Sequence, residues 1–253
     1  MFRPRLIPVL LLQNNALVKS VKFKNHNYIG DPINAVKIFN DLKADELVLL
    51  DIDASLEGRR ISSEVIRRVG EEANMPFSVG GGIKSIEDIK EVIACGAEKA
   101  ILNTHAIQNP LLIKEAAEHF GSSTIVLCID VRKKFLGKSN YVFIKNGREV
   151  TQYNPVDLAK IAEEMGAGEI IIQSIANDGT MQGYDIELIK SISNSVTIPT
   201  VALGGAGGID DFKNAYQNGS VNGIAAGSFF VYQGSNKGVL INYPSKEDII
   251  KIT

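Results

Sequence analysis

Eight short apolar runs alternate with stretches of helical pattern along the whole chain, and this order of elements limits the fold more than any other feature. The apolar residues within each run are nearly continuous, as expected for parallel strands that are buried on both faces. The predicted strands are Leu6–Leu12, Leu47–Asp53, Phe77–Gly80, Lys99–Asn103, Thr124–Val131, Glu169–Ser174, Thr200–Leu203 and Gly223–Ala226. The predicted helices between them are Pro32–Lys43, Ser85–Cys95, Pro110–Phe120, Pro155–Met165, Asp185–Ser193 and Asp210–Asn218. This pattern predicts a closed α/β barrel of the (β/α)8, or TIM barrel, type, with a doubly wound open sheet as the alternative.

The first half of the chain resembles the second. Segment 76–88 parallels segment 199–211, and glycines and acids recur at a spacing of 123 residues. The matched pairs are Gly81 and Gly204, Gly82 and Gly205, Glu46 and Glu169, Asp88 and Asp211, and Gly96 and Gly219. Repetition at one fixed spacing indicates an internal duplication. We therefore expect residues 1–253 to form a single barrel domain built from two similar half-barrels, about residues 1–122 and 123–253.

Composition narrows the classes of partner. At 253 residues the chain has the usual length of one barrel domain. Its formal net charge of −2 argues against a broad nucleic-acid-binding face but allows local sites for small anions. Cys95 and Cys128 lie in apolar sequence and are expected to be reduced core residues. His26, His105 and His119 show no ligand-like spacing, so we predict no metal site, and the sequence indicates no cofactor.

The apolar run that follows Arg3 and Arg5 superficially resembles a secretion signal. It contains Pro8, lacks a small-residue cleavage site and continues into Lys19 and Lys22, so a buried first strand is the better interpretation. No stretch approaches the roughly 20 apolar residues that a membrane span needs. We expect a cytoplasmic protein without a membrane partner.

Two glycine-rich loops each follow an apolar strand and precede a helix. Glycine lets backbone N–H groups approach an anion closely, and the following helix N-terminus adds a favourable dipole. Because both loops fall at the carboxyl ends of strands, we expect two phosphate sites on opposite sides of the barrel mouth. The residues predicted to bind phosphate are Gly81, Gly82, Asn103 and Thr104 at one site, and Gly204, Gly205, Ala226, Gly227 and Ser228 at the other. A ligand spanning both sites would be a bisphosphate or another extended dianion.

Six short motifs together resemble those of a known protein family. The motifs are Asp51-Ile-Asp53, the glycines 80–82, Asn103-Thr104, Asp178-Gly179-Thr180, the stretch Gly204–Gly207 and Gly166-Ala-Gly-Glu169. Together they resemble the cyclase (HisF) subunit family of imidazole glycerol phosphate synthase over roughly residues 5–230. The resemblance implies a partner glutaminase that releases ammonia at the N-terminal barrel face. Ammonia would cross the barrel interior to a bisphosphorylated substrate at the other face, where Asp178 and Gly179 would join the phosphate-binding residues.

The resemblance also implies a charged gate at the entrance of the barrel. The matching residues are Arg5, Glu46, Lys99 and Glu169, all at or just before strand starts, where they could form a ring of alternating charge. The alternative is a set of salt bridges that only caps the barrel bottom, although desolvation offsets much of the attraction of a buried ion pair. Glu98 matches a position that contacts the glutaminase. A solvated surface acid is the alternative for Glu98.

One catalytic position of the family lacks its carboxylate. The family uses two aspartates as general acid and base, at the ends of the first and fifth strands; Asp130 matches the second, but Leu11 occupies the first. Leucine can neither accept nor give a proton. Lys19 matches a lysine near the substrate, with a solvated loop lysine as the alternative. The acids that could replace the missing one are Asp51, Asp53 and Asp178.

Two further segments depart from the family. The family usually closes with a long amphipathic helix, but segment 233–244 contains turn formers and a β-like apolar run, followed by a short helix predicted at Ser245–Ile252. Segment 133–148 predicts an extra hairpin after the fifth strand, with Gly137 and Asn146-Gly147 around an apolar-aromatic run.

These features favour a paralogous, ammonia-using branch with a different acceptor. The resemblance extends to branches that act with a dedicated glutaminase and a third protein, converting an acetamido group on a nucleotide-linked surface sugar into an acetamidino group. A nucleotide sugar carries a diphosphate, so the phosphate loops would retain a use. The alternatives are the ordinary cyclase of histidine biosynthesis, with another acid in place of the missing one, and a noncatalytic scaffold that channels ammonia. A sugar-phosphate isomerase is less favoured, because it too needs paired acid-base groups and has no use for a gate.

Overall fold

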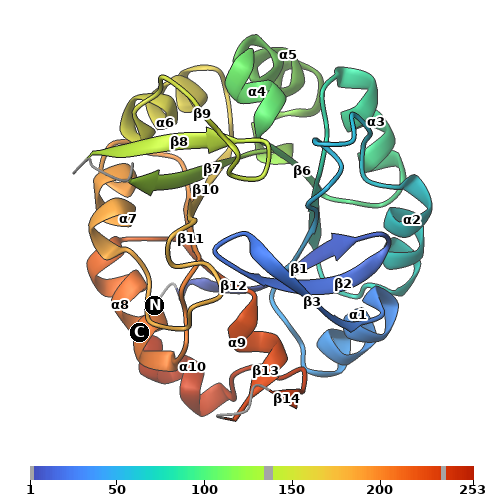
Figure 1. Ribbon diagram of the computed structural model, residues 1–253, viewed down its shortest axis with the longest axis vertical. Helices are drawn as coiled ribbons and strands as arrows, with labels where there is room; N and C mark the ends of the chain where they lie inside the picture. Colours follow the sequence, from blue (N-terminus) through green and yellow to red (C-terminus); the bar gives the residue numbers. More distant parts are fainter. Residues whose placement is uncertain (1–2, 134–138, 235–237) are drawn as a thin grey trace.

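The computed structural model describes residues 3–133, 139–234 and 238–253 and forms a closed parallel barrel ringed by helices (Figure 1). The barrel strands, in spatial order, are β1 (Arg5–Gln13), β4 (Leu47–Asp51), β5 (Phe77–Gly80), β6 (Lys99–Leu102), β7 (Ile125–Lys133), β10 (Glu169–Ser174), β11 (Thr200–Leu203) and β12 (Gly223–Ala226). Each is parallel to its neighbours, and the pairing of β12 with β1 closes the circle. The predicted (β/α)8 barrel is confirmed, and the open-sheet alternative is wrong.

Helices cover the outside of the barrel. They are α1 (Pro32–Asp41), α2 (Ser63–Glu72), α3 (Ile86–Ala94), α4 (Thr104–Gln108), α5 (Leu111–Phe120), α6 (Pro155–Glu164), α7 (Ile186–Ser193), α8 (Ile209–Gly219), α9 (Ser228–Val231) and α10 (Lys246–Ile252), with a 3₁₀ turn η1 (Ser122–Thr124). The six predicted helices are confirmed with small shifts at their ends. The side chains of Asp31 and Ser85 cap α1 and α3 by accepting backbone hydrogen bonds. Sequence analysis missed α2, whose three buried residues, Val65, Ile66 and Val69, make a short apolar stripe.

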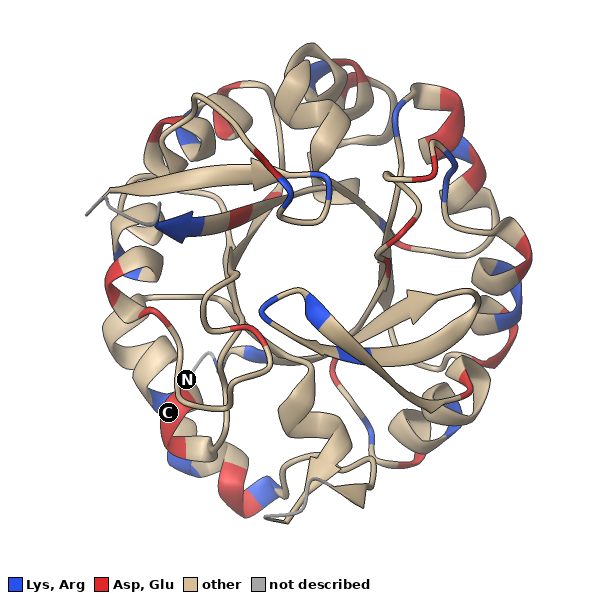
Figure 2. Ribbon diagram, viewed as in Figure 1, with Lys and Arg blue, Asp and Glu red and all other residues tan. Residues whose placement is uncertain are grey.

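Side chains alternate between two apolar layers along each barrel strand. On β1, Leu6, Leu10 and Leu12 pack against the helices, whereas Ile7 and Val9 point into the barrel. Charged residues lie mainly on the outer helices, and the barrel strands are largely free of them (Figure 2). The inner layer therefore forms an apolar column that runs from the strand starts to the strand ends.

Two hairpins stand over the carboxyl ends of the strands. One joins β2 (Ala16–Val21) to β3 (Lys24–Gly30), and the other joins β8 (Asn140–Ile144), which pairs with β7, to β9 (Glu149–Val150). Their tips meet, since a Cβ added to Gly147 would lie 3.1 Å from the Phe23 ring. The predicted extra hairpin is confirmed at its Asn146-Gly147 turn, while Gly137 lies outside the described residues. The β2–β3 hairpin was not predicted.

The C-terminal segment ties back to the start of the barrel. The Tyr243 hydroxyl donates to the Leu6 carbonyl (2.9 Å) and accepts from the Asp45 N–H (3.1 Å). Before it, β13 (Tyr232–Gln233) pairs with β14 (Gly238–Val239), so the turn-rich segment 233–244 contains strand structure, although residues 235–237 lie outside the described ranges. The short helix α10 confirms the predicted one. Among the described residues, no helix has the length and apolarity to cross a membrane.

Candidate functional site

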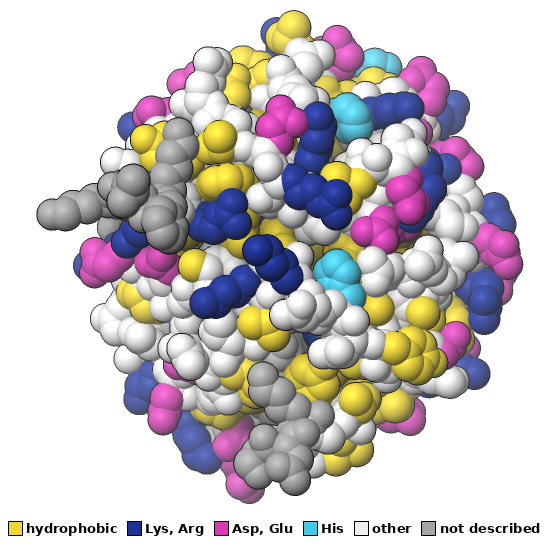
Figure 3. All heavy atoms as spheres, in the orientation of Figure 1, with side chains coloured by type: hydrophobic (Ala, Val, Ile, Leu, Met, Phe, Trp, Pro, Cys, Tyr) yellow, Lys and Arg dark blue, Asp and Glu magenta, His cyan; other side chains and the backbone are white. Residues whose placement is uncertain are grey.

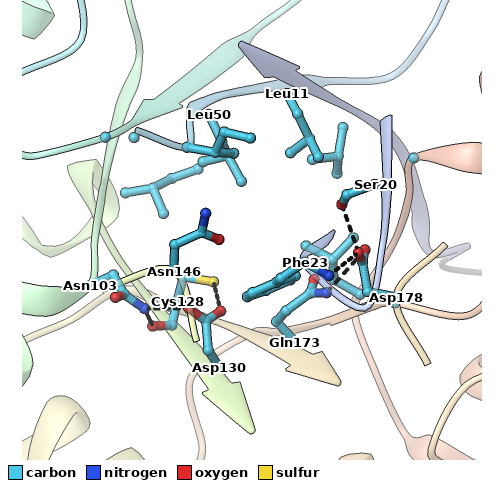
Figure 4. A pocket seen from close by; sticks show the side chains of 18 of the residues that line it. Leu11, Ser20, Phe23, Leu50, Asn103, Cys128, Asp130, Asn146, Gln173 and Asp178 are labelled. Carbon is cyan, nitrogen blue, oxygen red and sulfur yellow. Dashed lines mark hydrogen bonds between the residues drawn. The ribbon is translucent and has the colours of Figure 1, made fainter. Parts of the chain in front are cut away.

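A single pocket at the carboxyl ends of the barrel strands contains every residue predicted for the active face (Figure 4). These residues are Leu11, Lys19, Gly81, Gly82, Asn103, Thr104, Asp130, Asp178, Gly179, Gly204, Gly205, Ala226, Gly227 and Ser228. They come from both halves of the chain. The mouth of the pocket lies beneath the two hairpins, on the face where Lys and Arg side chains gather near the centre (Figure 3). Such a face attracts anionic ligands.

Asp130, on β7, is a buried acid that lines the pocket. Its side chain is 7% exposed, and it accepts hydrogen bonds from the Asn103 amide (3.2 Å) and the Cys128 thiol (3.6 Å). Burial raises the pKa of Asp130 to about 7, and the nearby charge of Asp178 adds to this effect, while the two hydrogen bonds partly offset it. A carboxyl group with such a pKa can exchange a proton near neutral pH.

Lys19 is buried on β2, which excludes the solvated loop lysine considered from sequence. The side chain is 3% exposed, and its ammonium donates to the Val9 carbonyl at 2.5 Å. Its Nζ also lies close to Gly227, where an added Cβ would come within 2.5 Å of it. Burial lowers the pKa of Lys19 to about 8, and the charge of Asp178 partly offsets that fall. The lysine therefore brings a positive charge beside the second predicted phosphate loop.

The side of the pocket formed by β1 and β4 is apolar. Leu11 and Leu50 are paired in register and face the cavity opposite Asp130 (Figure 4). Of the nearby acids, Asp51 forms an ion pair with Arg59, whereas Asp53 accepts a hydrogen bond from Gln13 at 2.8 Å and is not among the residues that line the pocket.

The side formed by β7 and β10 is polar. Asp178 accepts hydrogen bonds from the Ser20 hydroxyl (3.0 Å) and the Phe23 N–H (3.4 Å), and thus holds the β2–β3 hairpin against the pocket. Burial raises the pKa of Asp178 as well, although Ser20 and Lys19 work against the rise. Gln173, 4% exposed, donates to Asp178 at 3.5 Å.

The two glycine loops have conformations that other residues would not tolerate. Gly82 has φ of 66°, and a Cβ there would lie 1.8 Å from the Arg59 carbonyl oxygen. Gly205, its counterpart in the second half, has φ of 116°, and its Cβ would lie 2.1 Å from the Gly183 carbonyl oxygen. Both glycines are therefore required by the backbone, whether or not an anion binds there.

The four residues predicted for the gate form a closed ring of ion pairs at the strand starts. Arg5 contacts both Glu46 and Glu169, and the Lys99 ammonium lies 3.0 Å from Glu46 and 2.9 Å from Glu169. Burial alone would lower the pKa of Arg5, but the two carboxylates outweigh it and raise the pKa. The charges therefore alternate in sign around the ring. Glu98, beside Lys99, is exposed.

An apolar column connects this ring to the pocket. On β10 the inward residues are Glu169 in the ring, Ile171 in the column and Gln173 at the pocket. On β1 the same order is Arg5, then Ile7 and Val9, then Leu11. The column itself consists of Ile7, Val9, Val48, Ile101, Val126, Cys128, Ile171, Val201, Leu203 and Ala225. Both cysteines are buried and free, as predicted.

Several pocket residues were missed from sequence. They are Ser20, Phe23, His26, Leu50, Asn146 and Gln173. Gln173 lies 123 residues after Leu50, the same spacing that relates the glycine loops, so the duplication contained a signal for both. No comparable signal existed for Phe23 and Asn146, because they reach the pocket only through the meeting of two hairpins.

Comparisons with known proteins place this architecture in context. The family model described as "Histidine biosynthesis protein" matches residues 5–237. The chain is 48% identical to "Putative imidazole glycerol phosphate synthase subunit HisF" of Leptospira interrogans, covering 98% of both chains. It is 44% identical to "Putative imidazole glycerol phosphate synthase subunit hisF3" of Vibrio vulnificus, over 98% of this chain and 95% of that one. It is 40% identical to "Imidazole glycerol phosphate synthase subunit HisF" of Alkaliphilus metalliredigens, over 92% of each.

Proposed function

Since the chain belongs to the histidine biosynthesis protein family and resembles its HisF subunits, we propose that it is the synthase subunit of a glutamine amidotransferase complex. In this proposal a partner glutaminase supplies ammonia at the ring of ion pairs. The ammonia passes through the apolar column and reacts with a phosphate-bearing acceptor in the pocket. The main support for the proposal is the order of three features along the barrel: the ring of ion pairs, the apolar column, and the pocket that contains Asp130.

The composition of the path supports transport of a neutral molecule. The column offers no side-chain charge between the ring and Asp130 on the strands that form it, so ammonium would lose its hydration there while ammonia would lose far less. The alternating ring can act as a gate, because a shift of the Lys99 ammonium away from either glutamate would open the circle at one point. Glu98 is exposed next to the ring and is a candidate contact for the glutaminase.

The pocket supports an acceptor with separated phosphate groups. The two glycine loops lie on opposite strands of the barrel, and Lys19 stands beside Gly227 of the second loop. The hairpins add exposed cations at the mouth, namely Lys22, Lys24 and Arg148. We propose that the loops bind phosphate through backbone N–H groups and that the basic residues attract the ligand.

Asp130 is the proposed proton acceptor. When ammonia attacks an electrophilic carbon, a new N–C bond forms, the electrons of the carbon–oxygen double bond move to oxygen, and nitrogen becomes positively charged. The Asp130 carboxylate removes a proton from that nitrogen. Its raised pKa also suits the following step, since the protonated acid can give that proton to the departing oxygen.

The apolar side of the pocket argues for an acceptor other than the family's bisphosphate. Cyclisation to imidazole glycerol phosphate would use a second acid, and Leu11 and Leu50 provide none. Asp178 is the only alternative acid considered from sequence that is not bound to arginine and lines the pocket, but it holds the hairpin. We therefore propose a nucleotide sugar whose acetamido group becomes acetamidino.

That conversion replaces the amide oxygen by nitrogen, and the oxygen leaves as phosphate once a nucleoside triphosphate has phosphorylated it. An amide carbonyl is a weak electrophile, so a third protein would activate it at the expense of a nucleoside triphosphate. In this arrangement the barrel both delivers ammonia and supplies the base.

The test follows nitrogen from glutamine. The protein, its glutaminase and the third protein would be given glutamine with an isotope-labelled amide, ATP and UDP-N-acetylglucosamine, with the family bisphosphate in a parallel reaction. We expect label in the sugar. Label in an imidazole product, with none in the sugar, would favour the ordinary cyclase instead. Product formation that survives Asp130→Asn in the full complex would favour a noncatalytic channel.

A further inference from the structure

We propose that Gln173 is the residue that receives ammonia at the end of the apolar column, using its side-chain oxygen as a hydrogen-bond acceptor. This inference rests on the proposed function and assigns a step of it to a residue that sequence analysis did not identify. It assigns the position at which ammonia binds before it reacts. Asp130, next to Gln173, then accepts the proton.

The orientation of the Gln173 amide follows from its neighbour. Its Nε2 faces the Asp178 carboxylate at 3.5 Å, and only the NH₂ end of an amide can donate to a carboxylate. The Oε1 atom is therefore the other end of the group. Within residues 3–133, 139–234 and 238–253, this buried oxygen has no hydrogen-bond donor. A buried acceptor without a partner is unfavourable, so a small donor that reaches this oxygen would be stabilised there.

The position of Gln173 indicates that this ligand arrives through the apolar column. Gln173 is in register with Asp130 on β7, and it stands two residues beyond Ile171 of the column on the same strand. Leu203 of the column is in register with Gln173, and the second glycine loop begins one residue later, so a molecule leaving the column here meets Gln173 before that loop.

Ammonia complements these two groups. It carries three N–H donors and has just crossed a column lined mainly by apolar side chains. Gln173 Oε1 and the Asp130 carboxylate can accept two of those hydrogens and leave the lone pair directed into the pocket. The opposite side, Leu11 and Leu50, offers no acceptor, so the ammonia is held on one side only.

A neutral acceptor suits this position better than a second carboxylate. A carboxylate would favour ammonium, which is not a nucleophile, whereas an amide oxygen binds ammonia without drawing a further proton to it. The amide thus retains the nitrogen in its reactive form beside the base.

The experiment compares ammonium-driven and glutamine-driven reactions of the full complex in Gln173→Met and Gln173→Ala. Both changes remove the acceptor, and the alanine variant does so without adding volume, so one of them remains informative if the other fails to fold. We expect the KM for ammonium to rise about tenfold in each while the KM for UDP-N-acetylglucosamine changes less than about twofold. In the glutamine-driven reaction, more labelled ammonia should escape to solvent.

Gln173→Glu provides the rescue. Burial and the neighbouring acids favour the protonated form of this side chain, which donates through O–H and accepts through C=O as glutamine does. We expect its KM for ammonium to return toward the wild-type value. The control is Gln217→Met, the same chemical change on the exposed face of α8, which should change neither KM.

The outcomes separate the inference from the proposed function. If wild-type complex incorporates no nitrogen from either source, the proposed function fails and the role of Gln173 fails with it. If wild type is active and both acceptor-removing variants keep the wild-type KM for ammonium, only the role of Gln173 is overturned. Equal rises in both KM values would also overturn it, since that pattern indicates a structural role.

Discussion

The β1–β4 side of the pocket and the β7–β10 side occupy equivalent places in the barrel but present opposite chemistry. Leu11 and Leu50 face the cavity from one side, and Asp130 and Gln173 face it from the other. Leu50 and Gln173 are separated by the same 123 residues as the paired glycines. Far from the mouth the two sides remain alike, because Glu46 and Glu169, also 123 apart, hold the same two cations of the ring.

The contrast indicates that the residues at the entrance of the barrel can stay alike while the residues in the pocket differ. Each half of the chain contributes one of the two glutamates of the ring, and each contributes one of the two glycine loops. Only the acid-base and acceptor groups belong to one half. A barrel with this division can receive ammonia and bind phosphate on both sides while its proton transfer depends on β7 and β10.

The largest effect is expected from Asp130→Asn. If the polar side carries the chemistry, loss of the base should lower the rate of ammonia-dependent product formation by about 10² to 10⁴-fold. The rate of the full complex at saturating substrates measures this. A matched change at an exposed acid, Asp41→Asn, should leave the rate unaltered. A rate loss below threefold for Asp130→Asn would contradict the assignment of the acid-base chemistry to the polar side of the pocket.

The ring provides the next test, because each half of the chain contributes one of its two glutamates. Lys99→Met leaves Glu46 and Glu169 without one of their cations and should lower the free energy of unfolding by about 2 to 4 kcal/mol. Urea unfolding followed by circular dichroism measures the loss. Glu98→Gln, at the adjacent exposed position, should change stability by less than about 0.5 kcal/mol.

The difference in the pH dependence of stability between wild type and Asp130→Asn reports on the polar side. The unfolded Asp130 carboxyl ionises near its ordinary pKa of 3.8, whereas the folded one keeps its proton until about pH 7. Between these values the unfolded state binds fewer protons, so this group lowers stability as pH rises. Asp130→Asn should therefore gain about 3 to 4 kcal/mol relative to wild type between pH 4 and pH 8. Unfolding curves at both pH values measure this gain, with Asp41→Asn as the control. If the pKa of Asp130 were ordinary, the stability difference between Asp130→Asn and wild type would be nearly the same at pH 4 and pH 8.

The smallest effects come from exchanging the paired residues between the two sides. Leu50→Gln places an amide among leucines and should destabilise by about 1 to 2 kcal/mol. Gln173→Leu removes an acceptor that has no donor within the described residues, and its effect on unfolding should stay within about 1 kcal/mol of zero. Equal destabilisation by both substitutions would show that the two sides are not different environments.

The sequence predicted the framework of the site because that framework depends on local patterns. Continuous apolar runs located all eight barrel strands, and glycines that follow strands located both loops. The four ring residues were predicted through the family resemblance, and their contacts bear out the predicted alternation of charge, while their gating role stays a proposal. The half-barrel boundary near residue 122 also stays a prediction.

What could not be predicted depends on contacts between distant segments. Lys19 lies in a hairpin that was not identified, and its burial arises from contact with Val9 and the neighbourhood of Gly227. The tip contact of Phe23 with Gly147 joins segments more than a hundred residues apart. The raised pKa of Asp130 likewise follows from burial, which no local pattern around residue 130 specifies.

Our main hypothesis is that the leucine side of the pocket prevents cyclisation while the polar side still uses ammonia. Its most direct measurement is the formation of imidazole glycerol phosphate from the family bisphosphate and ammonium, in wild type and in Leu11→Asp. We expect no detectable imidazole glycerol phosphate from wild type. We expect the product from Leu11→Asp, in which an acid again faces Asp130. Turnover by wild type that Leu11→Asp does not increase would contradict it.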